Sequence, residues 1–393
     1  MRKKLLVFVL CFTLILPFVV SCNQQAEETE TTDTSTDTSV VTQAELGEPN
    51  LRVLSFNVRM DLNPVSGGLL TGAAKNRIQA VREQILSYEP DVFGLQEDVN
   101  LWVDNINISN NSYSVYRPDV RMTVETDEYC SIYVRKGMVV KDSGWKWITS
   151  NATRDAVALT YAELTDGDGK YDMDIAELLN LGIINDATLK TRYVDSADNK
   201  NYGYTLAARL MNYVVLEVEG KTVIYVNTHF QHRGYDNKEY TAHPLYMLRY
   251  YERCAQYDMV KDEIEELKKT YADAHVIISG DFNDRSTSDF FKYVEKDFLD
   301  SMKIAKKGSK LEHSWNAAFK VDKQGQGYTY EHENAVSSRI DFCIVSESLR
   351  DRVAFYQVGS VKWTLALAEG TATQNVNVYP SDHLPVIVDF CIG

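Results

Sequence analysis

The sequence predicts a domain of the α/β class. Strand-like apolar runs at 51–58 and 91–95 enclose an amphipathic helical segment at 76–88. A second long helical segment, 245–267, separates two further apolar runs. Several of these runs end on Asn, Glu, Asp or His, and polar residues at strand ends are where such folds build sites. The 393 residues allow one large domain or two ordinary ones.

The N-terminal residues 1–21 are predicted to be a lipoprotein signal peptide. A basic start precedes the apolar segment 5–20, which is short for a membrane span and is interrupted by Pro17. Small residues stand directly before Cys22, as in a bacterial lipobox, so Cys22 would be the lipidated first residue of the mature chain. A plain secretory signal or a short anchor helix is the alternative. Lipidation predicts a bacterial cell-envelope protein, anchored to a membrane through Cys22 and facing the periplasm or the cell surface.

Residues 22–50 are predicted to be an acidic, disordered tether. The segment is rich in Thr, Ser, Glu, Asp and Gln and cannot bury enough apolar surface to fold. The formal charge is −15 for the whole chain, −18 without the basic residues of the signal, and −11 for the domain without the acidic residues of the tether. This charge is not that of a protein that holds long nucleic acid by phosphate neutralisation. A nuclease is not excluded, because a bound divalent cation offsets acid locally.

The cysteines of the domain are Cys130, Cys254, Cys343 and Cys391. Cys343 and Cys391 lie in apolar runs and are predicted to be core residues. The spacing is not that of a metal site. A disulfide is allowed outside the cytoplasm, but the sequence does not determine its pairing.

Two strands near the start of the domain end on candidate site residues. The run 51–58 alternates like a strand and places Asn57 at its end. Pro90 ends the helix that follows, and the next strand leads to Glu97. The alternative for Glu97 is a carboxylate in a surface turn.

A strand predicted at 127–134 is followed by an insertion. The strand would put Glu128 on the same side as Cys130, and if that side is buried the carboxylate needs a partner. Residues 150–205 are predicted to be an insertion between two strands. Within it, 166–174 superficially resembles a calcium loop but lacks the bidentate Glu at the twelfth position, which favours an acidic hairpin turn.

Arg209 and His229 flank a predicted β-hairpin. Arg209 precedes a strand at 210–218, and the turn Gly220–Lys221 leads into a second strand that ends near His229. A hydrogen-bonded core histidine is a fair alternative for His229 alone.

The stretch 274–284 is the most informative. An apolar strand at 274–278 is predicted to break at Ser279–Gly280 and to deliver Asp281 and Asn283 at its end. Residues two apart in an extended segment point the same way, so a carboxylate and an amide can converge on a hard cation or an attacking water. An Asx turn after the strand is the alternative, since Asp and Asn favour such turns.

The last two strands carry three further candidates. A strand at 338–345 places Asp341 among apolar neighbours, where burial without a hydrogen-bonded partner would be costly. Asp382 and His383 set an acid and an imidazole side by side at the entrance to the final strand, 386–390.

Together, these segments resemble the endonuclease/exonuclease/phosphatase superfamily, which includes pancreatic-type deoxyribonuclease, abasic-site endonucleases, bacterial sphingomyelinases and inositol polyphosphate 5-phosphatases. Each segment alone is a weak signal, but the ordered set is specific. The resemblance implies a four-layer α/β/β/α sandwich of two mixed β-sheets flanked by helices, with the active site at one end. The insertion departs from the usual spacing of the family. The matching segments are 55–58, 95–97, Glu128 with 132–133, 227–229, 279–283, 339–342 and 381–383.

The resemblance also implies a divalent-metal-dependent phosphoesterase. Glu97, assisted by Asn57, would hold Mg²⁺ (or Mn²⁺) on a phosphate oxygen, since oxygen ligands suit a hard ion. Asp382 would touch the metal. Asp281 and Asn283 would orient or deprotonate the attacking water.

The histidines have implied roles of the same kind. His383, held by Asp341, would bind the phosphate and stabilise the developing charge. His229, paired with Glu128, would do so from the other side, and Arg209 would reach a phosphate. A carboxylate next to a histidine raises the affinity of the imidazole for its proton, which favours acid catalysis near neutral pH.

The residues indicate the reaction class better than the substrate. A basic cluster is more simply a solvated face than a nucleic-acid groove; it comprises Lys303, Lys306, Lys307, Lys310 and Arg339. A lipid-headgroup phosphodiesterase would suit a tethered enzyme, but no exposed aromatic hairpin is identified, and a small phosphomonoester or sugar phosphate is a third hypothesis. The competing class is a non-catalytic binding lipoprotein on the same fold. No protein partner is predicted.

Overall fold

The computed structural model describes the chain in ranges that cover most of the domain. The predicted signal peptide with Cys22, the tether as far as residue 46 and the calcium-like loop 166–174 lie outside the described residues. Of the insertion, only the short parallel strands β6 (Leu159–Thr160) and β7 (Tyr193–Val194) are described. Within the described part of the chain, no helix is long and apolar enough to cross a membrane. The described ranges are 47–60, 72–108, 112–118, 128–148, 159–160, 193–194, 209–232, 244–309, 313–315, 319–321, 328–330, 338–360, 362–369 and 372–393.

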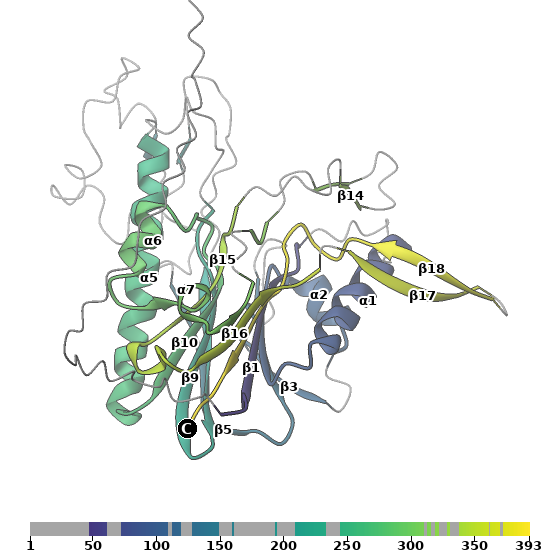
Figure 1. Cartoon of the computed structure of the whole chain (residues 1–393). Coiled ribbons are helices and arrows are strands. Elements are labelled where there is room, and N and C mark those ends of the chain that lie inside the picture. The colour runs from purple at the N-terminus through teal and green to yellow at the C-terminus, as the bar shows by residue number, and fades with distance from the viewer. Residues whose placement is uncertain are drawn as a thin grey trace, which may run out of the picture. The chain divides into compact units, whose positions relative to one another are not determined.

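Two mixed β-sheets form the centre of the fold (Figure 1). The seven-stranded sheet has the order β12 (Lys307–Gly308), β16 (Val353–Val358), β19 (Val386–Phe390), β1 (Leu51–Asn57), β2 (Val92–Gln96), β4 (Ile132–Arg135) and β3 (Tyr113–Tyr116). The six-stranded sheet has the order β11 (Leu299–Asp300), β15 (Asp341–Val345), β10 (His275–Asp281), β9 (Lys221–His229), β8 (Leu210–Val218) and β5 (Val139–Trp147). In each sheet one parallel pair lies at the centre: β1 with β2, and β9 with β10.

The sheets pack face to face over a shared apolar core. Buried side chains of both sheets meet there, among them Val53 and Val388 from one sheet and Tyr225, Ile277 and Cys343 from the other. Burial of these side chains removes apolar surface from water, which is the main favourable term in folding. Cys343 and Cys391 are both buried, as the sequence predicts.

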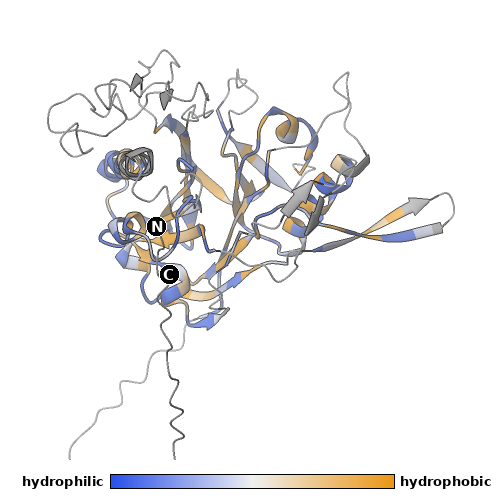
Figure 2. Cartoon of the chain, turned by 90° about the horizontal axis from the view of Figure 1, so that it is seen from above, coloured by the Kyte–Doolittle hydropathy of each residue, from blue (hydrophilic) through white to orange (hydrophobic). Residues whose placement is uncertain are grey.

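A helical layer covers the outer face of each sheet, which confirms the predicted four-layer sandwich. Helices α1 (Gly72–Ser87) and α2 (Asn100–Asn105) pack on the seven-stranded sheet, and α5 (Pro244–Thr270) and α6 (Asp289–Val294) pack on the other. Figure 1 shows α1 and α5 on opposite sides of the strands, and Figure 2 shows the hydrophobic, orange strands between the helical layers.

The remaining elements are short or lie at the edges. They are α7 (Ser301–Ile304), the 3₁₀ helix η2 (Glu347–Leu349), the pair β13 (Phe319–Val321) and β14 (Tyr328–Tyr330), and the hairpin β17 (Trp363–Glu369) with β18 (Ala372–Val378). The hairpin is joined to α1 by a hydrogen bond from Trp363 Nε1 to Glu83 Oε2 of 3.1 Å.

Two predicted strands start later than expected. The strand predicted at 127–134 begins at Ile132, because Cys130 has a left-handed backbone (φ 46°) that cannot continue a pleat. Glu128 is therefore buried from a loop and not from a strand. The strand predicted at 338–345 begins at Asp341.

Two predicted turns also differ. Ser279–Gly280 does not break the strand: β10 continues to Asp281, with Gly280 paired to Thr228 and Phe342. The β8–β9 turn is Glu219–Gly220, one residue earlier than predicted, and both residues have positive φ, 48° and 73°. Such angles match the right-handed twist of a two-residue hairpin.

Candidate active site

The ends of the two parallel pairs bring the candidate residues together. Asn57 and Asp281 are the last residues of β1 and β10, and His229 is the last of β9. The ladder pairs Asp281 with both His229 and Asp341. Because parallel strands end at the same edge of a sheet, the two sheets present these side chains at one end of the sandwich.

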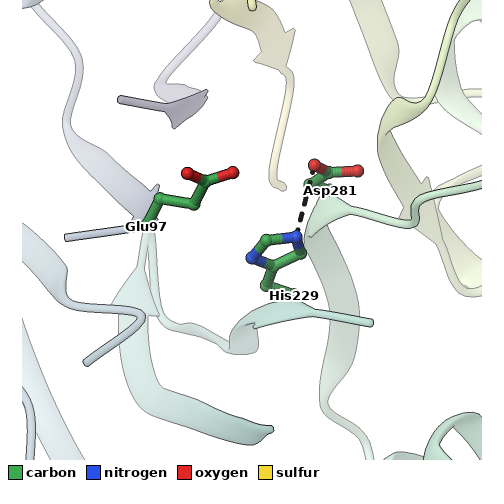
Figure 3. A group of neighbouring side chains, drawn as sticks. All are labelled: Glu97, His229 and Asp281. Atoms are coloured by element: carbon green, nitrogen blue, oxygen red, sulfur yellow. Dashed lines mark ion pairs between the residues drawn. The ribbon is translucent and has the colours of Figure 1, made fainter. Parts of the chain in front are cut away.

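Glu97, His229 and Asp281 form a cluster across the two sheets (Figure 3). One ligand atom of each lies within 4.8 Å of those of the other two. His229 Nε2 is 3.4 Å from Asp281 Oδ2, and Glu97 faces the pair from the other sheet. Asn57 Nδ2 donates to Glu97 Oε1 at 3.0 Å and to Asp281 Oδ2 at 2.9 Å, so it joins the two carboxylates.

The backbone at the cluster is held in a costly conformation. Glu97 and Asn283 have φ of 60° and 52°, in the left-handed region that non-glycine residues rarely adopt. Glu97 N donates to Glu128 Oε2 at 2.6 Å, and Met60 N donates to Glu97 Oε2 at 2.9 Å. Such strain persists only where surrounding contacts over-determine it, and it concentrates at functional sites.

His229 lies in a buried charge network with Glu128 and Arg209. His229 Nδ1 is 2.8 Å from Glu128 Oε1, and Arg209 Nη1 is 2.7 Å from the same nitrogen and donates to Glu128. Burial and Arg209 oppose protonation, but Glu128 and Asp281 outweigh them and raise the pKa of His229 to about 9. Burial also opposes the ionisation of Glu128, yet His229 and Arg209 lower its pKa to about 2. The pair is therefore ionic at neutral pH.

His383 is held by a second buried carboxylate. Its Nδ1 is 2.9 Å from Asp341 Oδ2, and Ser314 Oγ donates to the same oxygen at 2.6 Å. Burial disfavours the imidazolium, but Asp341 and Asp281 raise the pKa of His383 to about 10. Burial raises the pKa of Asp341 to about 6, against the opposing effect of His383, so this carboxylate is also ionised at neutral pH.

Asp281 stands between the two histidines. Its Oδ2 is 3.4 Å from His229 Nε2 and 3.7 Å from His383 Nε2. Although burial opposes ionisation, the two imidazoles hold the pKa of Asp281 well below its usual range. In both histidines Nδ1 faces another carboxylate, so Nε2 is the atom that each presents to the cluster.

Asp281 and Asn283 converge as the sequence predicts, but through a turn. Asn283 N donates to Asp281 Oδ1 at 2.7 Å, which is the Asx turn considered as the alternative. The turn directs Asn283 Nδ2 to within 2.7 Å of His229 Nε2. Neutral His229 accepts this hydrogen bond, whereas the imidazolium donates to Asp281. The Asx turn is therefore what brings Asp281 and Asn283 together at the cluster.

Asp382 is the predicted metal residue that lies apart from the cluster. Its Oδ2 pairs with Arg59 Nη1 at 2.6 Å and accepts from Trp315 Nε1 at 3.4 Å. In the described part of the chain, the ligand groups that could hold a metal are Glu97–His229–Asp281 and Asp281–Asp341–His383.

The donor set of the cluster fits a divalent cation. Two carboxylates from different sheets lie within reach of one point, with an amide and imidazoles beside them. Carboxylate oxygens are ligands that Mg²⁺ and Mn²⁺ prefer, and Glu97 and Asp281 offer them. Asn57 turns its amide nitrogen to the carboxylates, and its Oδ1 accepts from Arg59 N at 2.9 Å, so its oxygen faces the backbone.

A family model described as the Endonuclease/Exonuclease/phosphatase family matches residues 54–383. The chain belongs to this family. The match covers every described site residue from Asn57 to His383 and makes the chain a hydrolase that acts on phosphoester bonds. No curated protein sequence matches the chain.

Solved structures with the same fold include three that cover 87–88% of this chain. An endonuclease/exonuclease/phosphatase family protein from Bacteroides thetaiotaomicron shares 18% identity over 88% of this chain and 98% of its own, with a TM-score of 0.54. A mannosyl-6-phosphatase from the same organism shares 18% identity over 87% and 100%, also with a TM-score of 0.54. TDP2 from Caenorhabditis elegans shares 17% over 88% and 77%, with a TM-score of 0.50. At such identities the likeness shows the fold.

Sequence reasoning missed several residues that support this endonuclease/exonuclease/phosphatase site. Ser314 holds Asp341 but lies far from any recognised motif. Asn227 lies in a recognised motif without a predicted role. It bridges the two sheets: its Nδ2 donates to Leu95 O at 2.8 Å and to Cys130 O at 2.9 Å, and its Oδ1 accepts from Gln96 Nε2 at 2.6 Å. A buried Asn in a strand could have signalled such a bridge, because buried polar groups need partners.

Proposed function

We propose that the chain is a divalent-metal-dependent phosphoesterase in which water attacks a phosphodiester or phosphomonoester. The observation that carries the proposal is the convergence of Glu97, His229 and Asp281 within 4.8 Å, beside the pair of His383 with Asp341. Phosphoester hydrolysis builds negative charge on nonbridging and leaving oxygens, where a cation, imidazolium groups and amide donors help most.

The metal would be held mainly by Glu97. When bound, Mg²⁺ or Mn²⁺ would supply positive charge at a phosphate oxygen. Asn57 supports this role, since its amide fixes the carboxylates of Glu97 and Asp281 relative to each other. Asp382 would contribute only after leaving its pair with Arg59.

Asp281 and Asn283 would act on the attacking water. Asp281 stays ionised at neutral pH, because both histidines hold its pKa well below the usual range. An ionised carboxylate can accept a proton from water or a hydrogen bond that orients it. Asn283 would hold the same water, since the Asx turn brings its amide to the cluster.

The histidines would act on the phosphate and the leaving oxygen. Glu128 and Asp341 keep the two imidazoles protonated at neutral pH and fix Nδ1. Each Nε2–H, which faces Asp281 in this structure, would donate to a phosphate oxygen when the ester binds. Arg209 would then support His229 and Glu128, with its side chain only 8% exposed, and would not be the main phosphate contact.

A small phosphate ester is the substrate class that we infer. The chain is acidic, and two described members of the basic cluster are engaged by acids: Arg339 is fully buried against Asp300, and Lys306 pairs with Asp351 at 3.0 Å. The mannosyl-6-phosphatase is matched over 100% of its own chain and 87% of this one, which makes sugar phosphates the first compounds to test.

The place of action follows from the N-terminal sequence. We infer a lipid anchor on Cys22 and an acidic tether that hold the enzyme in the bacterial envelope, on the basis of the lipobox and the composition of residues 22–50. Labelling with a clickable fatty acid tests this: Cys22→Ala should abolish incorporation, and retained label would contradict the anchor.

Hydrolysis assays test the proposed function. Wild-type protein should hydrolyse bis-p-nitrophenyl phosphate, p-nitrophenyl phosphate or a member of a sugar-phosphate, sphingomyelin and nucleic-acid panel with Mg²⁺, and lose that activity in EDTA. His383→Ala, Asp281→Ala and Glu97→Ala should each lower the rate by about 10²–10³-fold, the usual cost of a principal electrostatic group. Hydrolysis of nothing in the panel would favour the non-catalytic binding lipoprotein, and near-wild-type rates in all three variants would contradict the assigned roles.

A further inference from the structure

Arg59 is a partly exposed arginine near the cluster. Its side chain is 28% exposed and pairs with the side chain of Asp382, which is 11% exposed. Among the other arginines near the site, Arg77 and Arg253 are fully buried and the Arg209 side chain is 8% exposed. Arg285 is half-buried, and its Nε donates to Ser338 Oγ at 2.9 Å. Arg59 is thus a partly exposed cation whose carboxylate partner directly precedes His383.

A buried support fixes Arg59 in a strained conformation. Its φ is 56°, in the left-handed region. Its carbonyl accepts from Arg77 Nη2 at 2.8 Å and from Trp102 Nε1 at 2.8 Å. Arg77 is fully buried, and burial of a guanidinium is costly without hydrogen-bond acceptors. The carbonyl of Arg59 is one of these acceptors, so Arg77 fixes the position of the Arg59 backbone.

The same support joins Arg59 to the loop of Asp382 and His383. Arg77 Nη1 donates to Val58 O at 2.9 Å and to Pro380 O at 3.1 Å. Arg77 therefore fixes together the segment after β1 and the segment before β19. Arg59 and Asp382 lie on these two segments and pair with each other.

The pair also borders both halves of the site. Arg59 N donates to Asn57 Oδ1 at 2.9 Å, and the next residue, Met60, donates to Glu97. Asp382 directly precedes His383. The Arg59–Asp382 pair is therefore within two residues of Asn57 on one side and directly before His383 on the other.

We propose that Arg59 binds the phosphate of the substrate, and that Asp382 occupies this guanidinium in the ligand-free protein. A guanidinium offers the same forked donors to a carboxylate and to a phosphate. The two anions therefore compete for Arg59, and the carboxylate is released when phosphate binds. The inference rests on the proposed phosphoesterase function but concerns binding, which is measured without turnover.

Binding of inorganic phosphate to the metal-free protein in EDTA, followed by ³¹P NMR, tests the competition. Arg59→Gln should weaken binding at least tenfold, since it removes a charge-assisted contact. Asp382→Asn should strengthen binding several-fold, because it removes the competing charge. The double variant should bind like Arg59→Gln, since the competitor matters only while Arg59 is present.

Arg52 provides the matched control. It forms a bidentate pair with Asp389, at 2.6 and 2.8 Å, which joins the same strands, β1 and β19, at the far end of β1 from Asn57. Arg52→Gln removes an Arg–Asp pair of the same type and should leave phosphate binding unchanged. Phosphate affinity should fall in Arg59→Gln and rise in Asp382→Asn. The rise separates competition from misfolding, because a misfolded variant does not bind phosphate more tightly.

Three results would overturn the inference. They are absence of phosphate binding by the wild type, equal binding by the wild type and Arg59→Gln, and an Asp382→Asn variant that binds phosphate no better than the wild type. If the two variants change phosphate affinity as expected but the panel of esters is not hydrolysed, the proposed function fails and the phosphate site stands. If the esters are hydrolysed but the affinities do not change as expected, the phosphate site fails and the proposed function stands.

Discussion

Asp281 is the residue on which the electrostatics of the site depend. Its Oδ2 faces Nε2 of both His229 and His383. Each histidine has a second carboxylate at Nδ1, so each imidazole lies between two acids. An opposite charge at such distances favours the charged form, which explains why burial does not neutralise these histidines.

The Asp341–His383 pair makes a pH prediction for the metal-free protein. Asp341→Asn removes the largest effect that raises the pKa of His383, so its titration should move down from about 10 towards the ordinary value. Because the folded pKa of His383 lies above the unfolded one, the raised pKa of this imidazole contributes stability that is present below about pH 6.5 and is lost as the pH rises towards 10. Histidine-resolved NMR titration measures the shift. An unchanged titration in Asp341→Asn would mean that another group holds the proton.

At the scale of elements, β10 shows why a strand that seems to end continues. Ser279–Gly280 suggests a break, yet Gly280 lies in the ladder with φ 152°. A Cβ there would lie 1.8 Å from Thr228 O. The glycine thus allows β9 and β10 to approach closely just before His229 and Asp281, and positions both.

Gly280→Ala should therefore destabilise the protein by about 3 kcal/mol or more, in the upper range for single substitutions. Gly137→Ala is the control: it also has positive φ, 100°, but its Cβ would meet nothing within 4 Å, so its cost of about 1 kcal/mol would be that of the backbone alone. Urea unfolding measures both. Equal effects of the two variants would show that the contact with Thr228 does not matter.

Sequence patterns predict the elements better than the contacts between them. Period and apolar runs place α1, β2, β9 and β19 within a few residues. The prediction of a strand through Glu128 is wrong, because hydrophobic periodicity does not reveal the single left-handed residue, Cys130. The pairs of Asp341 with Ser314 and of Asp382 with Arg59 are equally hidden, since they join segments far apart in the chain.

At the scale of the whole molecule, the chain from Leu46 to Gly393 forms one compact unit. Its first residues are tied to the C-terminus: Asn50 Nδ2 donates to Ile392 O at 2.6 Å, and Ile392 N donates to Asn50 Oδ1 at 2.8 Å. Cys391 Sγ also donates to Gly47 O at 3.0 Å. The fold therefore begins before β1.

Truncation tests where the domain starts. A chain that begins at Leu46 should unfold at the same temperature as the mature protein and hydrolyse a soluble ester equally well. A chain that begins at Leu51 should lose several degrees of thermal stability, because it lacks the Asn50 contacts with Ile392. Equal melting temperatures, measured by differential scanning calorimetry, would contradict this.

The sandwich as a whole explains the site, because neither sheet contains it alone. One sheet supplies Asn57 and Glu97, and the other supplies His229, Asp281 and Asp341. The family resemblance predicts this convergence from seven ordered segments, but periodicity alone does not, since it says nothing about which strands lie opposite each other.

Binding of Mn²⁺, followed by electron paramagnetic resonance, tests most directly whether these side chains share one cation. The account predicts one tight site in the wild type, an affinity at least tenfold lower in Glu97→Gln, and no change in the distant control Arg52→Gln. Wild-type affinity in Glu97→Gln would contradict it.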